Sequence, residues 1–505
     1  MDKSSHDYLL AFDLGTTGNK VVLIDVDSAA VVDSETARYP TSSGPGGKFE
    51  QSPEDWWAST VHGCRAIAER CPDAVKNVVA IGCTGMMNGV VVVDATGHSI
   101  RPSIIHADTR AAGQSARLAE LLGTSKIWQS THNRPDCRLS LYKAMWLAEN
   151  EPETLRQAAS IVQSKDYLTG RLTGRIGITD PSDASLTGAF DVGGRQWVRE
   201  LWTEAGLPER LLPAVAGSTD VLGEVTHQAA RELGIRAGIP VVTGGGDGPC
   251  ATAGSGVRRG EAYHYLGSSS WIGLSSTRPV DDDRLSHYCS LDDGVTVFGT
   301  VQAAGTSLEW FLTAFGVEGA ATLDKEAAGV AAGSDGLFFL PYLQGERAPL
   351  WDAAARGVYI GITPAHGRAS MYRAVLEGVG YALRSILDVY AVNGHPLPEL
   401  RQLGGGASSP LWRSILAAIF ERRLLSITGV SSATCLGAAM AAGVGIGIWP
   451  SIREAGARLT SVDAVTQPDP ALAAAYRPRM DFYRTLYPAL QDRFNALATI
   501  ECKEA

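Results

Sequence analysis

The stretch from Tyr8 to Ile24 reads YLLAFDLGTTGNKVVLI. Two apolar runs, residues 8–12 and 21–24, flank the hexapeptide that begins at Asp13, in which two glycines bracket two threonines. Apolar runs separated by a glycine turn are typical of paired strands, because glycine tolerates the positive φ of a tight turn. The sequence therefore predicts a strand, a turn that carries two hydroxyl groups, and a second strand.

Two interpretations of this turn are open. It can be a plain hairpin turn, or its successive backbone N–H groups and its hydroxyls can bind a phosphate group. In the second case Asp13 can bind Mg²⁺, usually through water. The turn is not a P-loop, because residues 21–24 continue as a strand, and the chain lacks the GxGxxG, HRD and DFG motifs of other nucleotide-binding proteins.

The overall composition is that of an ordinary globular protein. The chain has 505 residues, of which 45% are hydrophobic and 19% charged, enough for two domains. The net charge of −10 and the lack of a basic tract argue against nucleic-acid and acidic-membrane partners. We find neither a signal peptide nor an apolar run of membrane-spanning length, so we expect a cytoplasmic protein. The eight cysteines form no C-x-x-C pair and are expected to be free thiols.

Glycine clusters follow short apolar runs at four places, which begin at Gly15, Thr243, Leu266 and Leu403. Residues 263–274 (YHYLGSSSWIGL) resemble residues 9–23 in arrangement, which indicates an internal duplication. Helical periodicity is expected after the Ser-Pro-Glu-Asp cap at Ser52, and over residues 368–390, 411–420 and 433–442. Mixed strands and helices predict an α/β protein whose two domains pack closely around a cleft.

Asp247 is a second acid beside a glycine turn, in the segment GGGD. If one acid follows a strand in each half, the pair can serve phosphoryl transfer. One carboxylate then holds the metal, and the other accepts the proton of the attacking hydroxyl. The plain alternative for Asp247 is a helix N-cap, which is compatible with that role.

Taken together, these and several further segments resemble the FGGY carbohydrate kinases of the actin-like ATPase superfamily, over roughly residues 8–488. The segments that carry the resemblance are FDLGTTGNK at 12–20, HADTR at 106–110, YKAMWL at 142–147, KDYLTG at 165–170, DPSDASLTG at 180–188, GGGD at 244–247, LGSSS at 266–270, GERAPLWD at 345–352 and GGGASSPLW at 404–412. The resemblance implies two ribonuclease-H-like domains, residues 1–246 on the sugar side and 247–505 on the nucleotide side. It also implies ATP and Mg²⁺, a sugar substrate and, as a family-level expectation, a homodimer.

The resemblance also implies roles for individual residues. Asp247 is expected to be the general base and Asp13 the Mg²⁺-linked acid. The expected ATP- and phosphate-binding residues are Gly15, Thr16, Thr17, Gly267, Ser268, Gly305, Gly405, Gly406 and Ala407. The expected sugar-binding residues are Met87, Asn88, Asp108, Arg110 and Asp247.

Within the family the chain is most similar to the xylulokinase group, which implies phosphorylation of D-xylulose to D-xylulose 5-phosphate. It departs from that group at four positions. Met86 replaces the group's usual glutamine, and Asn88 replaces its usual sugar-binding histidine. Ala107 replaces the asparagine of the group's WND motif, and Gly248 replaces the last asparagine of its GGGDN motif. An unpartnered buried hydroxyl costs about 1–3 kcal/mol, so these changes can shift preference between sugars.

Alternatives therefore remain. The ADxR and DG features are also similar to gluconate kinases, and another ketose or polyol is a further possibility. In a different class, the chain can be an ATPase driven by a protein partner, or a sugar-binding regulator without kinase activity. The HADTR and DPSDASLTG segments favour a sugar pocket, and intact Asp13 and Asp247 argue against loss of catalysis.

Overall fold

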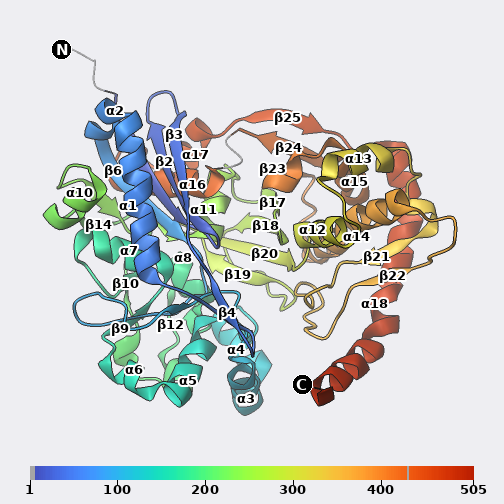
Figure 1. The fold of residues 1–505 in the computed structure, drawn as a ribbon, viewed down its shortest axis with the longest axis horizontal. Coiled ribbons are helices and arrows are strands. Elements are labelled where there is room, and N and C mark those ends of the chain that lie inside the picture. Colours follow the sequence, from blue (N-terminus) through green and yellow to red (C-terminus); the bar gives the residue numbers. More distant parts are fainter. Residues whose placement is uncertain (1–5, 429–431, 505) are drawn as a thin grey trace.

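The computed structural model describes residues 6–428 and 432–504, without the side chains of residues 501–504. Two seven-stranded mixed sheets lie side by side along the long axis of the molecule, each with helices on its faces (Figure 1). The α/β class predicted from the sequence is confirmed. The first half of the molecule contains the sheet built from residues 8–246, and the second half contains the sheet built from residues 262–466.

The first sheet is built around the quoted N-terminal stretch. Its strands, in spatial order, are β14 (Val221–Glu224), β15 (Pro240–Val242), β6 (Val78–Gly85), β1 (Tyr8–Leu14), β2 (Gly18–Asp25) and β3 (Val31–Arg38), and β16 (Gly245–Gly246) pairs with β6. Strands β1, β15 and β16 run parallel to β6, whereas β1, β2 and β3 form an antiparallel meander. The predicted strand–turn–strand is therefore the β1–β2 hairpin.

The second sheet repeats this topology. Its strands, in spatial order, are β25 (Val462–Thr466), β24 (Arg423–Ile427), β23 (Glu399–Leu403), β17 (Ala262–Leu266), β18 (Ser270–Ser276), β20 (Val295–Val301) and β19 (Ser286–Cys289). Here β17 and β18 form the hairpin, β23 runs parallel to β17, and β25 is the antiparallel edge strand, as β14 is in the first sheet. The shared order confirms the repeat that the two glycine clusters predict.

Each predicted helix is present. These are α1 (Pro53–Arg70), α14 (Arg368–Val392), α15 (Pro410–Phe420) and α16 (Ala433–Gly445). Ser52 occupies the N-cap position of α1, but its side chain makes no capping hydrogen bond. The capping interaction expected of Ser52 is thus absent, although proline does begin the helix.

The remaining elements are short, apart from the last helix. The other helices are α2 (Pro72–Lys76), α3 (Ala112–Leu122), α4 (Thr124–Thr131), α5 (Ser140–Asn150), α6 (Pro152–Gln157), α7 (Ser164–Thr173), α8 (Pro181–Ala184), α9 (Arg199–Glu204), α10 (His227–Leu233), α11 (Asp247–Gly254), α12 (Gly305–Ala314), α13 (Ala320–Ala328), α17 (Ile452–Leu459) and α18 (Pro470–Glu504). Small sheets outside the two main ones contain β4 (Ser42–Gly44), β5 (Lys48–Gln51) and β8 (Ser103–Ile104), β7 (Val91–Val93) and β9 (Ser160–Val162), β10 (Ile178–Thr179) and β13 (Ala214–Val215), β11 (Phe190–Asp191) and β12 (Gln196–Trp197), and β21 (Phe338–Leu340) and β22 (Val358–Ile360).

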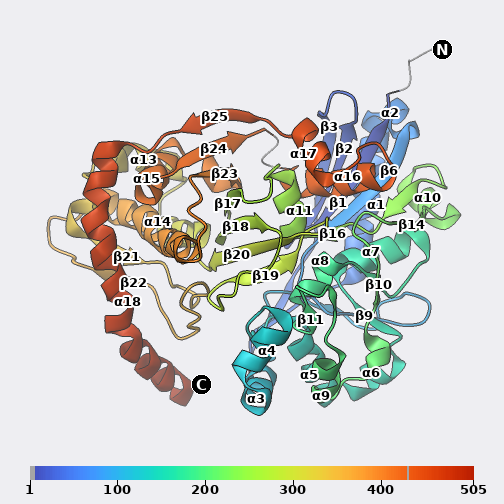
Figure 2. The same ribbon diagram turned by 180° about the vertical axis from the view of Figure 1, so that it is seen from behind.

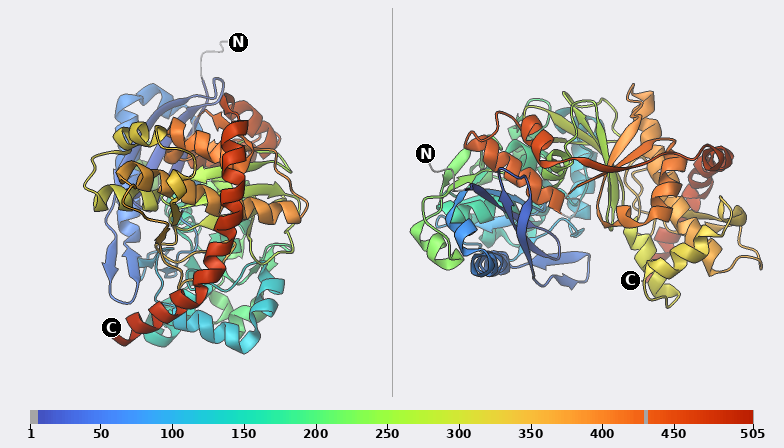
Figure 3. Two further views of the ribbon diagram at one scale, coloured as in Figure 1. Left: turned by 90° about the vertical axis from the view of Figure 1, so that its right-hand side faces the viewer. Right: turned by 90° about the horizontal axis from the view of Figure 1, so that it is seen from above.

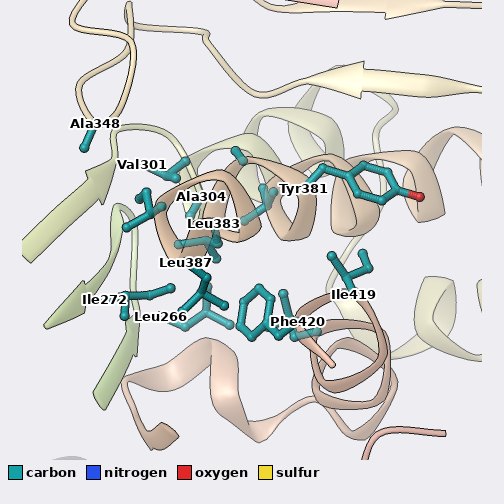
Figure 4. Packing of buried hydrophobic residues seen from close by; sticks show 14 of the residues in the cluster. Leu266, Ile272, Val301, Ala304, Ala348, Tyr381, Leu383, Leu387, Ile419 and Phe420 are labelled. Atoms are coloured by element: carbon teal, nitrogen blue, oxygen red, sulfur yellow. The ribbon is translucent and has the colours of Figure 1, made fainter. Parts of the chain in front are cut away.

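Helix α14 forms the centre of the core of the second half. Leu383 and Leu387 on α14 lie near Leu266 and Ile272 of the sheet, and Phe420 of α15 lies beside them (Figure 4). These side chains are almost wholly buried. The core fixes the ends of β17 and β23, from which two glycine loops emerge.

Helix α16 belongs to the second half in sequence but covers the first sheet (Figure 2). It packs on β1 and β6, and it crosses α11 at close range. A Cβ atom on Gly437 would lie 2.0 Å from the carbonyl oxygen of Cys250, and one on Gly82 would lie 2.1 Å from that of Ala438. Only glycine permits these approaches, so the two halves are joined through backbone-to-backbone packing.

The C-terminal helix α18 runs along the outer side of the second half (Figure 3). Among the described residues, no helix combines the length and apolarity that crossing a membrane requires. Seven of the eight cysteines can be assessed, and none of these seven is in a disulfide, as expected. Cys502 lies outside the described side chains.

Candidate active site

The two acids singled out in the sequence lie at one edge of the first sheet. Asp13 is near the end of β1, and Asp247 is the first residue of α11, directly after β16. Both strands run parallel to β6, so their carboxyl ends meet at the same edge. The expectation of one acid from each half is therefore wrong, because β16 belongs to the first sheet. Asp247 also follows the N-cap, which is Gly246, instead of being the cap.

The environment of Asp247 suits a group that accepts a proton near neutral pH. Burial and the nearby negative charge of Asp13 raise the pKa of Asp247 to about 7, although the backbone N–H of Gly248 donates to its Oδ1 at 2.8 Å. A general base works best when its pKa lies near the working pH. Asp247 can therefore accept a proton from a hydroxyl group that lies in contact with it.

Asp13 has partners that the sequence did not indicate. Burial raises the pKa of Asp13, against the opposing effects of a hydrogen bond from the Thr434 hydroxyl and the positive charge of Lys20. Thr434 lies in the first turn of α16, 421 residues away along the chain. No local signal marks this threonine, because only the packing of α16 on the first sheet brings it to Asp13.

The turn between β1 and β2 has the geometry of an anion-binding loop. The carbonyl of Gly15 accepts from the Tyr39 hydroxyl, that of Thr16 from Gln51 Nε2 at 2.8 Å, and that of Thr17 from the Tyr39 N–H at 3.4 Å. Among the described residues, the N–H groups of Thr16 and Thr17 donate no hydrogen bond. The hydrogen bonds from Tyr39 and Gln51 fix the carbonyl groups of the turn, and both threonines are exposed. The two N–H groups therefore remain available to a phosphate.

The turn between β17 and β18 is built in the same way. The carbonyl of Gly267 accepts from the N–H of Gly305 at 3.0 Å, and that of Ser268 accepts from the N–H of Ala304 at 2.9 Å. A Cβ atom on Gly305 would lie 2.5 Å from the Gly267 oxygen, so the start of α12 needs glycine at this position. The second turn is thus held by α12, as the first is held by Tyr39 and Gln51.

A cavity of about 350 Å³ gathers most of the predicted nucleotide-binding residues. It is lined by Gly267, Ser268, Gly305, Gly405 and Gly406. Ala407 lies beside the last two in the 3₁₀ turn Gly405–Ser408 and is buried. The structure therefore brings together residues that lie up to 140 positions apart in the sequence.

Asp324 and Tyr372 line the same cavity and were not indicated by the sequence. The Tyr372 hydroxyl donates to Asp324 Oδ1 and the Ser409 hydroxyl to Oδ2, each at 2.7 Å. Both carboxylate oxygens are thus occupied. These contacts fix the wall of the cavity behind the 3₁₀ turn.

Met87 and Asn88 follow β6 and lie next to the glycines that precede Asp247. Met87 is buried, and a Cβ atom on Gly246 would lie 2.5 Å from its Cγ. Asn88 has a φ of +64°, a conformation that asparagine tolerates, and its Oδ1 is buried without a partner among the described residues. Its carbonyl accepts from Lys143 Nζ at 2.7 Å, which gives that lysine a structural role. The Asn88 side chain is therefore a candidate ligand beside the base.

The side chains of Asp108 and Arg110 form an ion pair with each other and do not face an open site. Arg110 donates from Nε and Nη2 to Asp108 Oδ2, at 2.9 and 2.6 Å, and from Nη1 to Glu50 at 2.8 Å. Its guanidinium lies over the ring of Trp146, and Asp108 is wholly buried. These contacts hold both side chains in place, and the sugar contact expected of Asp108 and Arg110 stays a prediction.

A buried polar cluster supports β16, the strand that directly precedes Asp247. Lys165 Nζ lies 2.5 Å from Asp166 and 3.1 Å from Asp180, and all three side chains are buried. Asp180 caps α8, whose Ser182 hydroxyl accepts from the N–H of Gly246 at 3.2 Å. The KDY and DPSD segments thus meet beneath the catalytic edge and hold the residue before Asp247.

The donor set fits a magnesium ion that arrives with a nucleotide. Among the described residues, no group of three or more His, Cys, Asp or Glu side chains could hold a metal. Mg²⁺ is usually bound by one or two carboxylates together with water and phosphate oxygens, so it needs no such group. Asp13, close enough to Asp247 to raise the pKa of that residue, offers such a carboxylate.

This geometry agrees with the comparison with known protein families. Residues 8–254 match the N-terminal domain, and residues 262–446 the C-terminal domain, of the FGGY family of carbohydrate kinases. The chain belongs to the FGGY family of carbohydrate kinases. It is thus a sugar kinase with a two-domain actin-like ATPase fold, and ATP and a sugar are its substrates. The first matched region ends with α11 at residue 254 and the second begins at residue 262. The sequence predicts a domain boundary between residues 246 and 247, which stays a prediction.

This FGGY kinase is similar to relatives that are named for two different phosphate acceptors, xylulose and gluconate. It is 32% identical to the xylulose kinase of Escherichia coli, over 95% of this chain and 99% of the relative. It is 28% identical to the gluconokinase of Bacillus subtilis, over 97% of this chain and 98% of the relative. Among solved structures, the ligand-bound xylulose kinase of Lactobacillus acidophilus superposes with a TM-score of 0.90 at 26% identity, covering 97% of this chain and 100% of that one.

Proposed function

We propose that this FGGY kinase transfers the γ-phosphoryl group of ATP to the terminal hydroxyl of D-xylulose, giving D-xylulose 5-phosphate. The observation that carries the proposal is Asp247, whose pKa is raised to about 7 at an edge shared with Asp13. Asp247 accepts the proton of the sugar hydroxyl as the oxygen attacks phosphorus, and the phosphoryl group leaves ADP. Because ATP is made and consumed in the cytoplasm, we place the reaction there.

The remaining residues of the site position the phosphates. The free N–H groups of Thr16 and Thr17 bind phosphate oxygens from one side, and the turn at Gly267 and Ser268 binds them from the other. The cavity beside Gly405 and Gly406 holds the nucleoside part of ATP. Bound Mg²⁺, held by Asp13 through water, would neutralise charge on the phosphates.

The curated relatives favour D-xylulose over D-gluconate as the acceptor. The xylulose kinase of E. coli has the higher identity of the two relatives, 32% against 28%. Gly248 stands where the xylulokinase group carries asparagine, but the Tyr288 hydroxyl lies 3.1 Å from the position of a Cβ atom there. The Tyr288 hydroxyl, held by Thr252 and Tyr263, thus lies close to the place that the missing side chain would occupy.

A panel of acceptors tests the proposal. ADP formation is measured with purified protein, ATP and Mg²⁺, using D-xylulose, D-ribulose, D-gluconate and glycerol as acceptors. We expect kcat/KM to be highest for D-xylulose. A clear preference for D-gluconate would replace the proposed acceptor, and ATP hydrolysis that no sugar stimulates would contradict kinase activity.

A further inference from the structure

A second cavity, of about 420 Å³, lies between the two halves of the molecule. The first half contributes Arg134, Asp136 and Arg138, which precede α5, and the second half contributes Gln302, Glu346 and Arg347. Arg347 Nη2 lies 3.4 Å from Asp136 Oδ2, so an ion pair joins the two walls.

This cavity adjoins the sugar-binding side of the active site. Lys143 Nζ donates to the carbonyl of Asn88 at 2.7 Å and to that of Ile105 at 2.8 Å. The next residue, His106, has its pKa lowered to about 4 by burial and by the positive charges of Lys143, Arg347 and Arg138. A path therefore leads from Asn88, through Lys143 and His106, toward the charged wall of the cavity that contains Arg138 and Arg347.

Several buried polar atoms along this path have no partner among the described residues. They are Asn88 Oδ1, His106 Nδ1, Gln302 Oε1, Glu346 Oε2 and Arg347 Nε. Only 5% of Glu346 is exposed, and its Oε1 accepts from the N–H groups of Gln302 and Arg347, both at 2.8 Å. The carboxyl group is thus fixed in place, and its second oxygen still needs a partner. A buried polar group without a hydrogen-bond partner costs about 1–3 kcal/mol. A ligand that supplies the missing hydrogen bonds removes this cost.

The unpartnered oxygens along this path fit a hydroxyl-bearing end of the acceptor better than an acidic one. Asp136 pairs with Arg138 and Arg347, each at 3.4 Å, and Arg134 pairs with Asp283 at 3.3 Å. A hydroxyl group both donates and accepts, so it can satisfy the carbonyl-type oxygens of Gln302 and Asn88 as well as Arg347 Nε. A carboxylate only accepts, and it would leave those oxygens unpaired.

We propose that Gln302, Glu346 and Arg347 form a subsite that binds the hydroxyl-bearing end of the acceptor, opposite the hydroxyl that is phosphorylated. In D-xylulose this end carries the C1 hydroxyl and the C2 carbonyl. In D-gluconate it carries a carboxylate. The inference rests on the proposed function, and it adds residues of the second half as determinants of acceptor choice.

The test compares D-xylulose with 1-deoxy-D-xylulose, which lacks only the C1 hydroxyl. We expect the wild-type enzyme to have a kcat/KM about tenfold or more higher for D-xylulose, as the loss of one hydrogen bond implies. Gln302→Ala and Glu346→Gln should each lower kcat/KM for D-xylulose by about tenfold, mainly through KM. Neither should change kcat/KM for the deoxy sugar much, so the preference should largely disappear, with KM for ATP unchanged.

Glu346→Gln keeps the shape of the side chain and an oxygen for the two N–H groups, and Gln302→Ala provides a second, independent variant. Gln157→Ala, on the exposed surface of α6, is the matched control and should behave as wild type. Equal losses for both sugars, or no loss, would overturn the subsite while leaving the xylulose kinase activity standing. A wild-type preference for D-gluconate over D-xylulose would overturn both.

Discussion

Asp247 is the residue on which the chemistry depends, and its replacement gives the first prediction. Asp247→Asn should lower kcat by about 10²–10⁴-fold, the contribution expected of a general base, because asparagine cannot accept the proton. Sugar-dependent ADP formation measures this loss, and nucleotide binding should persist. Asp27→Asn, at an exposed position, is the control. Near-normal turnover of Asp247→Asn would contradict the assignment.

The raised pKa of Asp247 predicts a pH dependence. Below about pH 7 the carboxyl group is increasingly protonated and cannot act as a base; above it the carboxylate is available. We therefore expect kcat/KM for the sugar to rise with pH through about 7 and then level off, as measured from pH 5.5 to 8.5 with saturating ATP. A profile that is already flat at pH 5.5 would mean that Asp247 is ionised throughout.

Gly248 and Tyr288 should behave as a coupled pair. A Cβ atom at position 248 would lie 3.1 Å from the Tyr288 hydroxyl, which is held by Thr252 and Tyr263, also at 3.1 Å. Gly248→Asn should therefore destabilise the protein by about 1–3 kcal/mol, seen as a lower Tm. Adding Tyr288→Phe removes the oxygen but leaves Cε1 and Cζ of the ring, each 3.2 Å from that Cβ position, so it should recover only part of the loss. An unchanged Tm in the single variant would show that the neighbouring groups adjust freely.

At the level of elements, the crossing of α11 and α16 is the most constrained contact. Gly437→Ala would place a Cβ atom 2.0 Å from the Cys250 carbonyl oxygen, so the helices must separate. We expect a loss of about 1–3 kcal/mol in the free energy of unfolding, measured by urea denaturation. Gly113→Ala, in exposed α3 with only Arg117 Nη1 near at 3.9 Å, is the matched control. It should be neutral or stabilise by up to about 1 kcal/mol; equal effects would contradict the crossing argument.

The sequence predicts elements well where a local pattern defines them. The periodicity of residues 368–390 and 411–420 corresponds to α14 and α15, and the glycine turns correspond to the β1–β2 and β17–β18 hairpins. What the periodicity of α16 could not show is which sheet it covers. An apolar helix can bury itself against any apolar face, so its partner depends on the packing of the whole chain.

For the whole molecule, we predict that the first half does not fold alone. Leu9, Ala11, Val22 and Ile24 on one face of its sheet are buried against residues of α16 and α17. A fragment that ends at residue 256 would expose this apolar face. We expect aggregation, or strong binding of a hydrophobic dye without a cooperative thermal transition, and recovery when residues 257–505 are co-expressed. A soluble fragment with cooperative unfolding would contradict the prediction.

The sequence by itself determined the hairpins, the acids beside them and the family, because each is a local pattern of a few residues whose order is preserved along the chain. The tertiary structure decided which side chains share a site. It placed both acids at one edge of the first sheet, brought Thr434 to Asp13, and turned Asp108 and Arg110 toward each other. These contacts join residues far apart in the chain, and they depend on how sheets and helices pack, which no short stretch of sequence encodes.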